Sequence, residues 1–162
     1  MTTSTEASVR TSVAVEAPVE RAFDVFTKDM KSWWPPEHHI LASELVDTVV
    51  EPQEGGVMYD VGADGSTCRW GTVVAYERPT RFAFSWNIDL QWQIELDPAK
   101  TSDVEVRFAP DGASRTIVEL EHRHLDRHGE GWEGMREAVG SPDGWAVGLG
   151  RFARYTATGS PD

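Results

Sequence analysis

The sequence predicts an α+β domain in which a curved antiparallel sheet wraps around a C-terminal helix and encloses an apolar cavity. Three observations predict this fold. Most of the chain alternates apolar and polar residues, short turns separate the alternating segments, and an amphipathic helical segment follows them. Strands joined by short turns, without helices between them, form an antiparallel meander rather than a parallel sheet.

The N-terminal part predicts one strand and two short helices. Residues 8–17 alternate with a period of two, as a half-buried strand does. Pro18 suits the start of a helix, and apolar residues then recur at helical spacing from Val19 to Phe26. A second short piece carries Met30, Trp33 and Trp34 until Pro35 and Pro36 end it.

A series of strands follows. Strands are predicted at residues 44–51, 57–62, 67–77, 81–86, 104–108 and 116–123, and alternation over residues 90–96 indicates a strand extension. Within residues 67–77, the period of two predicts one shared face for Cys68, Trp70, Thr72, Val74 and Tyr76. The Asp111-Gly112 pair predicts a tight hairpin before the last strand.

The C-terminal part predicts two helical segments with a break between them. Residues 130–139 form the first, and Gly140-Ser141-Pro142-Asp143-Gly144 interrupts it, with Ser141 or Asp143 available as a cap. Trp145, Leu149, Phe152 and Thr156 then mark one helical face. We expect a single domain over residues 8–157, with polar tails at residues 1–7 and 158–162.

Composition excludes several classes of partner. The net charge is −12, and the 15 Lys and Arg residues are scattered, which disfavours nucleic acids and anionic membranes. No apolar run is long enough to span a membrane, and the polar start does not match a signal peptide. The single cysteine, Cys68, fits a reducing cytoplasm and is interpreted as a small strand residue. No phosphate loop, nucleophile elbow or dinucleotide fingerprint is present, so no cofactor is predicted.

Several motifs in order resemble a known superfamily. They are residues 13–23 with Trp33-Trp34-Pro35, residues 71–74 with Pro79 and 82–86, residues 116–122, and Asp143-Gly144-Trp145 leading to Phe152-Ala153. From about Ser8 to Tyr155 the chain resembles the START-like (SRPBCC) superfamily with its helix-grip fold. Within it, the chain is most similar to the branch of the C-terminal domain of the activator of heat shock protein 90 ATPase.

The resemblance implies a cavity between the final helix and the sheet, but it does not fix an activity. The superfamily includes lipid and hormone binders, polyketide cyclases and co-chaperone domains. The sequence has no segment matching the separate N-terminal domain of the eukaryotic activator, and no set of residues matching a known cyclase. No catalytic residue is therefore carried over.

Seven tryptophans in 162 residues supply the candidate ligand-binding surface. We expect a small hydrophobic or aromatic ligand to be bound by Trp33, Trp34, Trp70, Trp86, His122 and Trp145. Strand alternation after Val118 and Leu120 directs His122 inward. An imidazole in an apolar cavity either orients a ligand or acts as a general base, so His122 is the best catalytic candidate. The alternative is a core histidine bonded to the backbone.

Other polar residues give weaker hypotheses. His122, His124 and His128 raise the question of a metal site, but no cysteine or second cluster completes one, so none is predicted. His38 and His39 lie near the expected cavity entrance. Alternation places Arg69 and Arg107 on the outer face. Nothing in the sequence brings Asp29, Glu37 and Glu44 together as acid and base.

Three functions remain open from the sequence. The first is binding of a small hydrophobic or aromatic ligand in the cavity. The second is a cyclase or dehydratase that uses the cavity as a mould, with His122 as base. The third is a co-chaperone-like module whose acidic exterior steers a basic partner. We leave the formation of a homodimer open. As a partner, we favour a small hydrophobic molecule over a chaperone.

Overall fold

The computed structural model describes residues 7–35, 38 and 40–162. Its helices are α1 (Val19–Lys28), α2 (Met30–Trp33), α3 (Trp132–Gly140) and α4 (Trp145–Thr158), with 3-10 turns η1 (Pro98–Lys100) and η2 (Leu125–His128). Its strands are β1 (Val9–Val15), β2 (Leu45–Val50), β3 (Val57–Gly62), β4 (Thr67–Glu77), β5 (Arg81–Trp86), β6 (Ser102–Pro110) and β7 (Thr116–Arg123).

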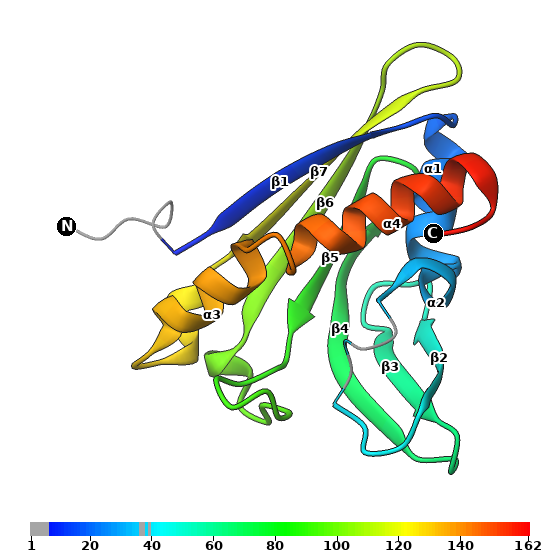
Figure 1. Ribbon diagram of the computed structural model, residues 1–162. Helices are drawn as coiled ribbons and strands as arrows, with labels where there is room; N and C mark the ends of the chain where they lie inside the picture. Colours follow the sequence, from blue (N-terminus) through cyan, green and yellow to red (C-terminus); the bar gives the residue numbers. More distant parts are fainter. Residues whose placement is uncertain (1–6, 36–37, 39) are drawn as a thin grey trace.

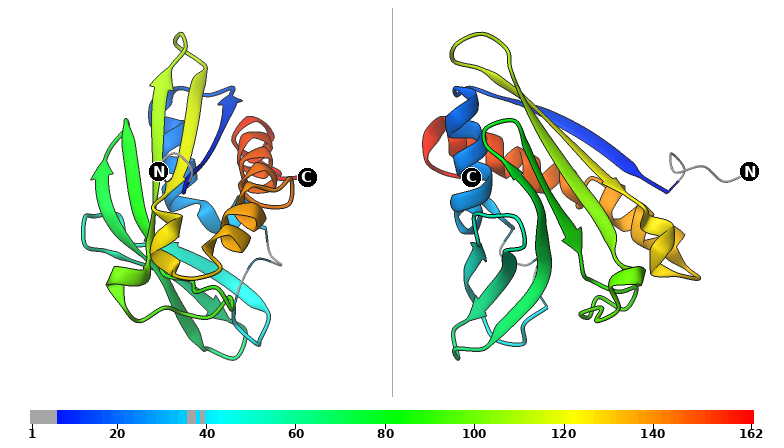
Figure 2. Two further views of the ribbon diagram at one scale, coloured as in Figure 1. Left: turned by 90° about the vertical axis from the view of Figure 1, so that its left-hand side faces the viewer. Right: turned by 180° about the vertical axis from the view of Figure 1, so that it is seen from behind.

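These strands form one antiparallel sheet in the order β1-β7-β6-β5-β4-β3-β2. The sheet curves around α4, which lies along its inner face, with α1 and α2 at one end and α3 at the other (Figures 1 and 2). The structure thus confirms the predicted helix-grip fold, including the two short N-terminal helices.

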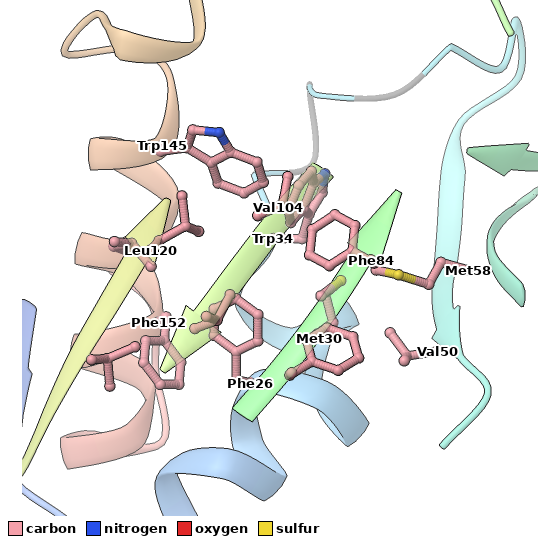
Figure 3. Packing of buried hydrophobic residues seen from close by; sticks show 14 of the residues in the cluster. Phe26, Met30, Trp34, Val50, Met58, Phe84, Val104, Leu120, Trp145 and Phe152 are labelled. Carbon is pink, nitrogen blue, oxygen red and sulfur yellow. The ribbon is translucent and has the colours of Figure 1, made fainter. Parts of the chain in front are cut away.

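The core lies between α4, α1 and the inner face of the sheet, as Figure 3 shows for Phe26, Phe152 and their neighbours. Phe26 of α1 contacts Phe152 of α4 with ring centroids 5.2 Å apart. Trp145, Leu149, Phe152 and Thr156 are buried along one face of α4, as their spacing predicts. Burial of these large aromatic surfaces holds the helix against the sheet.

Two register shifts in β4 change the face that its residues occupy. One lies opposite Met58 and Tyr59 and the other between Val73 and Ala75. Each inserts an extra residue, so alternation is interrupted. The prediction of one shared face is therefore wrong for Thr72 and Val74. Gly71 and Val73 are buried opposite Trp86 and Phe84, whereas Thr72 pairs with Ser85 and Val74 is 46% exposed.

The strand extension predicted over residues 90–96 is also wrong. This stretch is a loop with a single bridge between Ile88 and Ile94. The Asp89 carboxylate accepts the N–H groups of Gln91 and Gln93, and this local turn replaces strand pairing. Trp92 has a φ of 61° there and is half exposed.

The break before α4 falls where the sequence predicts, but the predicted caps are not used. Gly144 is the N-cap residue, with no side-chain cap. The Ser141 hydroxyl instead donates to the Ala138 carbonyl. A Cβ at position 144 would lie 2.2 Å from the Val139 carbonyl oxygen, so the close approach of the two helices requires glycine.

Some sequence hypotheses fall outside the described residues. These are Pro36, Glu37, His39 and most of the N-terminal tail, residues 1–6. In the part of the chain that the structure does describe, no helix is both long and apolar enough to cross a membrane.

Candidate functional site

A cavity of about 440 Å³ opens between the start of α4, the end of α3 and strands β3, β4 and β5. This volume falls within the range of small-molecule sites. Most of the wall is apolar, with Ile40, Ile88 and Val139 among its residues. Four lining residues have ionisable side chains: His38, Asp60, Cys68 and Asp143. Asp60 and Cys68 face each other on β3 and β4.

Five tryptophans line the cavity, and Trp92 in the loop after β5 is one of them. The other four contact one another and are here termed the indole wall: Trp34, Trp70, Trp86 and Trp145. Their rings contact one another in a closed circuit. Trp34 stacks on Trp70 at 5.2 Å and meets Trp145 at 5.8 Å. Trp86 meets Trp70 at 6.0 Å and Trp145 at 5.5 Å. All four are at most 9% exposed, so each indole is held by its neighbours as well as by its own strand or helix. Figure 3 shows Trp145 and Trp34 approaching each other from α4 and from the chain after α2.

Hydrogen bonds fix three of the four indoles. The ring nitrogen of Trp34 donates to the His38 carbonyl at 2.9 Å, and that of Trp70 donates to Asp60 Oδ1 at 3.1 Å. The ring nitrogen of Trp145 donates to His122 Nδ1 at 3.1 Å. Among the described residues, the buried ring nitrogen of Trp86 has no acceptor. Three fixed rings make a preformed surface, which lowers the entropic cost of binding a rigid ligand.

Asp60 is a buried carboxylate in the mainly apolar wall of the cavity. It lies on β3 and is only 3% exposed. Its Oδ1 accepts hydrogen bonds from the Thr48 hydroxyl at 2.9 Å and from the Trp70 indole. Burying a carboxylate is costly unless hydrogen bonds compensate it, and the bonds from Thr48 and Trp70 contribute to that compensation.

Sequence analysis missed Asp60, because the more apolar alternating set on β3 is Val57, Tyr59 and Val61, which directs Asp60 to the other face. In the structure it is Met58, Asp60 and Gly62 that are buried. Cys68 pairs with Asp60 across the strands. Burial, and secondly the charge of Asp60, raise the pKa of the Cys68 thiol, so Cys68 is a weak nucleophile at neutral pH.

His122 belongs to a buried hydrogen-bonded chain behind the indole wall. Its Nε2 lies 2.7 Å from Ser102 Oγ, which lies 2.7 Å from His128 Nε2. Because an indole only donates, Trp145 requires an unprotonated Nδ1 on His122. The proton of His122 is then on Nε2 and is donated to Ser102, whose hydroxyl donates to His128.

The same surroundings keep His122 neutral. Burial, and secondly the proximity of His128, lower the pKa of His122 from 6.5 to about 3. Burial likewise lowers the pKa of His128, partly offset by Glu95 and Asp89. At neutral pH the chain is therefore an uncharged network that fixes Trp145 from behind.

The structure separates the six predicted ligand-binding residues into two groups. Trp34, Trp70, Trp86 and Trp145 line the cavity. Trp33 and His122 do not belong to its lining.

Neighbouring side chains separate both Trp33 and His122 from the cavity. Trp33 is fully buried, contacts Phe26 and Phe152, and donates to the Val25 carbonyl. His122 faces inward on β7, but Trp86 and Trp145 pack on it, with ring centroids 5.2 and 6.0 Å away.

Other sequence candidates take peripheral places. His38 contributes to the cavity wall. His124 Nε2 lies 4.0 Å from Asp103 Oδ2, away from His122 and His128. Within the described residues, no three His, Cys, Asp or Glu side chains gather as a metal site would require. Arg69 and Arg107 are exposed, as alternation predicts.

Solved structures resemble this one along nearly the whole chain. The anthrahydroquino-Gama-pyrone synthase Txn09, solved as a complex, is 40% identical, with a TM-score of 0.65 over 91% of this chain and 95% of that chain. The self-sacrificing resistance protein CalC from Micromonospora echinospora is 25% identical, with a TM-score of 0.67 over 96% and 97%. Protein NE0264 from Nitrosomonas europaea shares the fold at 15% identity, with a TM-score of 0.68 over 96% and 97%. No protein among the curated sequences matches the chain.

The family model for activator of Hsp90 ATPase homolog 1-like proteins matches residues 16–156. This match runs from the end of β1 through most of α4 and so includes all four tryptophans of the indole wall. The chain therefore belongs to the family of activator of Hsp90 ATPase homolog 1-like proteins.

Proposed function

We propose that this protein binds a flat aromatic small molecule in the cavity between α4 and the sheet. The observation that carries the proposal is the indole wall, four mutually contacting tryptophans around about 440 Å³ of space. Flat rings stack on indoles and exclude water from large apolar surfaces. The 40% identity to a synthase named for a polycyclic aromatic product supports the same ligand class.

Calorimetric titration with anthraquinone and with a fatty acid of similar size tests the proposal. We expect saturable binding of anthraquinone and much weaker binding of the fatty acid, because only the planar compound stacks on the indole wall. Absence of saturable anthraquinone binding would refute the proposed ligand class.

A pair of variants on α3 separates the cavity from the outer surface. Ala138 lines the cavity and is half-buried, so Ala138→Phe fills the space from its rim. The neighbouring Glu137 is exposed and does not line the cavity, so Glu137→Phe adds the same ring outside it. We expect Ala138→Phe to abolish anthraquinone binding and Glu137→Phe to leave it unchanged. Equal affinity in both variants would remove the cavity from the proposal.

We propose as a second function a cyclisation with loss of water in the same cavity. The specific support is the 40% identity to a synthase whose name includes a pyrone. A pyrone ring forms when a phenolic hydroxyl adds to the far carbonyl of an aryl 1,3-diketone. The new C–O bond closes the ring, and the former carbonyl oxygen leaves as water. A rigid cavity accelerates such a step by holding the two reacting groups together.

The reaction has a simple probe in 1-(2-hydroxyphenyl)-1,3-butanedione, which cyclises to 2-methylchromone and water. Enzyme-dependent chromone formation, followed by ultraviolet absorbance and lost in Ala138→Phe, is the expected result. If chromone forms no faster with the protein than in buffer alone, the proposed cyclisation is refuted and the proposal of ligand binding stands. Since His122 does not line the cavity, we expect His122→Gln to retain most of the rate, and loss of the rate would restore His122 as the base.

A further inference from the structure

Trp92 differs from the other tryptophans of the cavity because it lies at the boundary between the cavity and solvent. It lines the cavity but is 46% exposed, whereas the four indoles of the wall are at most 9% exposed. Ring contacts join those four to one another, and within the described residues no ring contact includes Trp92. Cavity space therefore separates the Trp92 ring from the indole wall.

The loop that carries Trp92 does not need this ring for its own packing. The loop joins β5 to β6 and is the irregular green segment after β5 in Figure 1. Ile88 is buried, and Leu90 and Ile94 pack against the core, but Trp92 is not part of that packing. The apolar residues on both sides of Trp92 thus anchor the loop and leave the indole available for another contact.

The backbone of the loop holds Trp92 in an unfavourable conformation. Its φ of 61° lies in the left-handed region, which bulky residues rarely adopt. Hydrogen bonds enforce the turn: the Trp92 N–H donates to the Asp89 carbonyl at 3.0 Å, and the Asp89 N–H donates to the Gln93 carbonyl at 2.7 Å. The Asp89 carboxylate adds two further bonds to backbone N–H groups. Enforced conformations of this kind gather at ligand clamps.

We propose that Trp92 caps the bound ligand, with its indole on one face of a flat aromatic ring whose other face lies against the indole wall. This inference rests on the proposed binding of an aromatic ligand. It adds the residue that encloses the ligand and slows its release.

A second stacking face changes both the affinity and the kinetics of binding. A flat ring that contacts the indole wall alone leaves its other face in water, and Trp92 removes that face from water. Loss of one aromatic side chain from such a stack weakens binding roughly fivefold to a hundredfold. Because the cap lies at the cavity boundary, the loss should appear mainly as faster dissociation.

The variant Trp92→Asn tests the cap without disturbing the turn. Asparagine tolerates the left-handed conformation and has no ring to stack. We expect the dissociation constant of anthraquinone, measured by calorimetric titration, to rise at least about fivefold. Stopped-flow quenching of the remaining tryptophans should show a matching increase in the dissociation rate. The midpoint of thermal unfolding should stay the same or rise, because the lost ring does not pack in the core.

Two further variants separate the stacking ring from the rest of the loop. Trp92→Phe keeps an aromatic face and should retain the wild-type dissociation constant within about threefold. Leu96→Asn is the matched control, because Leu96 is an apolar residue of the same loop that is 88% exposed and lies outside the cavity lining. It should leave both the affinity and the dissociation rate unchanged.

The outcomes distinguish the cap from the proposed function. If the wild-type protein and Trp92→Asn bind anthraquinone equally well, the aromatic site stands and the cap is refuted. If Trp92→Asn lowers the unfolding midpoint, or if Trp92→Phe loses as much affinity as Trp92→Asn, a stacking cap is likewise refuted. If the wild-type protein does not bind anthraquinone, the proposed function itself fails and the cap fails with it.

Discussion

The buried His122 makes the stability of the fold depend on pH in a predictable way. In the unfolded chain its pKa is near 6.5, and in the folded protein burial and His128 lower it to about 3. Between these values the unfolded chain binds a proton that the folded protein does not. Stability is therefore complete above pH 6.5 and falls as the pH decreases toward 3.

The expected magnitude follows from the same pKa change. Each pH unit well inside the window costs about 1.4 kcal/mol. From pH 7 to pH 5, His122 alone should lower the free energy of unfolding by about 2 kcal/mol. Among the described residues, the carboxylates with lowered pKa act mainly below this range, because their ordinary values are 3.8 for Asp24 and Asp64 and 4.5 for Glu105.

Urea unfolding followed by tryptophan fluorescence at pH 7 and pH 5 measures the effect. His122→Gln is the comparison, because its amide oxygen accepts from Trp145 and its amide nitrogen donates to Ser102, yet it does not titrate. His128 is present in both proteins, so the comparison reports the titration of His122 together with its coupling to His128. We expect the wild-type protein to lose about 2 kcal/mol more than the variant between the two pH values. Equal losses would refute the neutral, buried state of His122.

Three further substitutions have defined outcomes, each measured by urea unfolding. Trp145→Ala should lower the free energy of unfolding by about 3 kcal/mol, because the side chain is buried in the core. It should also weaken anthraquinone binding, because Trp145 lines the cavity. Unchanged binding would remove Trp145 from the site. Gly144→Ala should destabilise by about 1–3 kcal/mol, since its Cβ meets a backbone carbonyl oxygen at 2.2 Å, and an unchanged midpoint would contradict the tight break before α4. Ser102→Ala should cost about 1–3 kcal/mol by leaving two buried imidazoles without a bridge, and a neutral effect would argue against the network.

Periodicity predicted the fold wherever one face of an element is buried. The stripe from Trp145 to Thr156 and the alternation of β7 both correspond to the structure. Periodicity failed to predict the structure where local hydrogen bonds, or an extra residue inserted in a strand, interrupt the alternation of apolar and polar residues. The first β4 bulge, at Trp70, turns Val73 inward and Val74 outward, and the Asp89 turn replaces a strand with a loop. Neither follows from apolar spacing, because the bulge depends on the register with the adjacent strand and the turn on hydrogen bonds of the Asp89 side chain.

The site was harder to predict because facing inward and lining a cavity are different properties. Trp33 and His122 face the interior as expected, but other aromatic side chains fill the space in front of them. Asp60 belongs to the less apolar alternating set of β3, yet it is buried and does reach the cavity. Only the packing of elements distant in sequence, α4 against β3 to β5, decides which inward residues border open space.

The most direct test of the central claim is a two-dimensional NMR titration of the seven tryptophan indole N–H signals with anthraquinone. Ligand in the cavity should shift the signals of the lining tryptophans in parallel, with one common affinity, because ring currents act over short distances. These are Trp34, Trp70, Trp86, Trp92 and Trp145. Trp33, screened in the core, should shift far less. Saturable binding that leaves the four indole-wall signals in place, or that shifts Trp132 on α3 instead, would contradict an aromatic ligand site between α4 and the sheet.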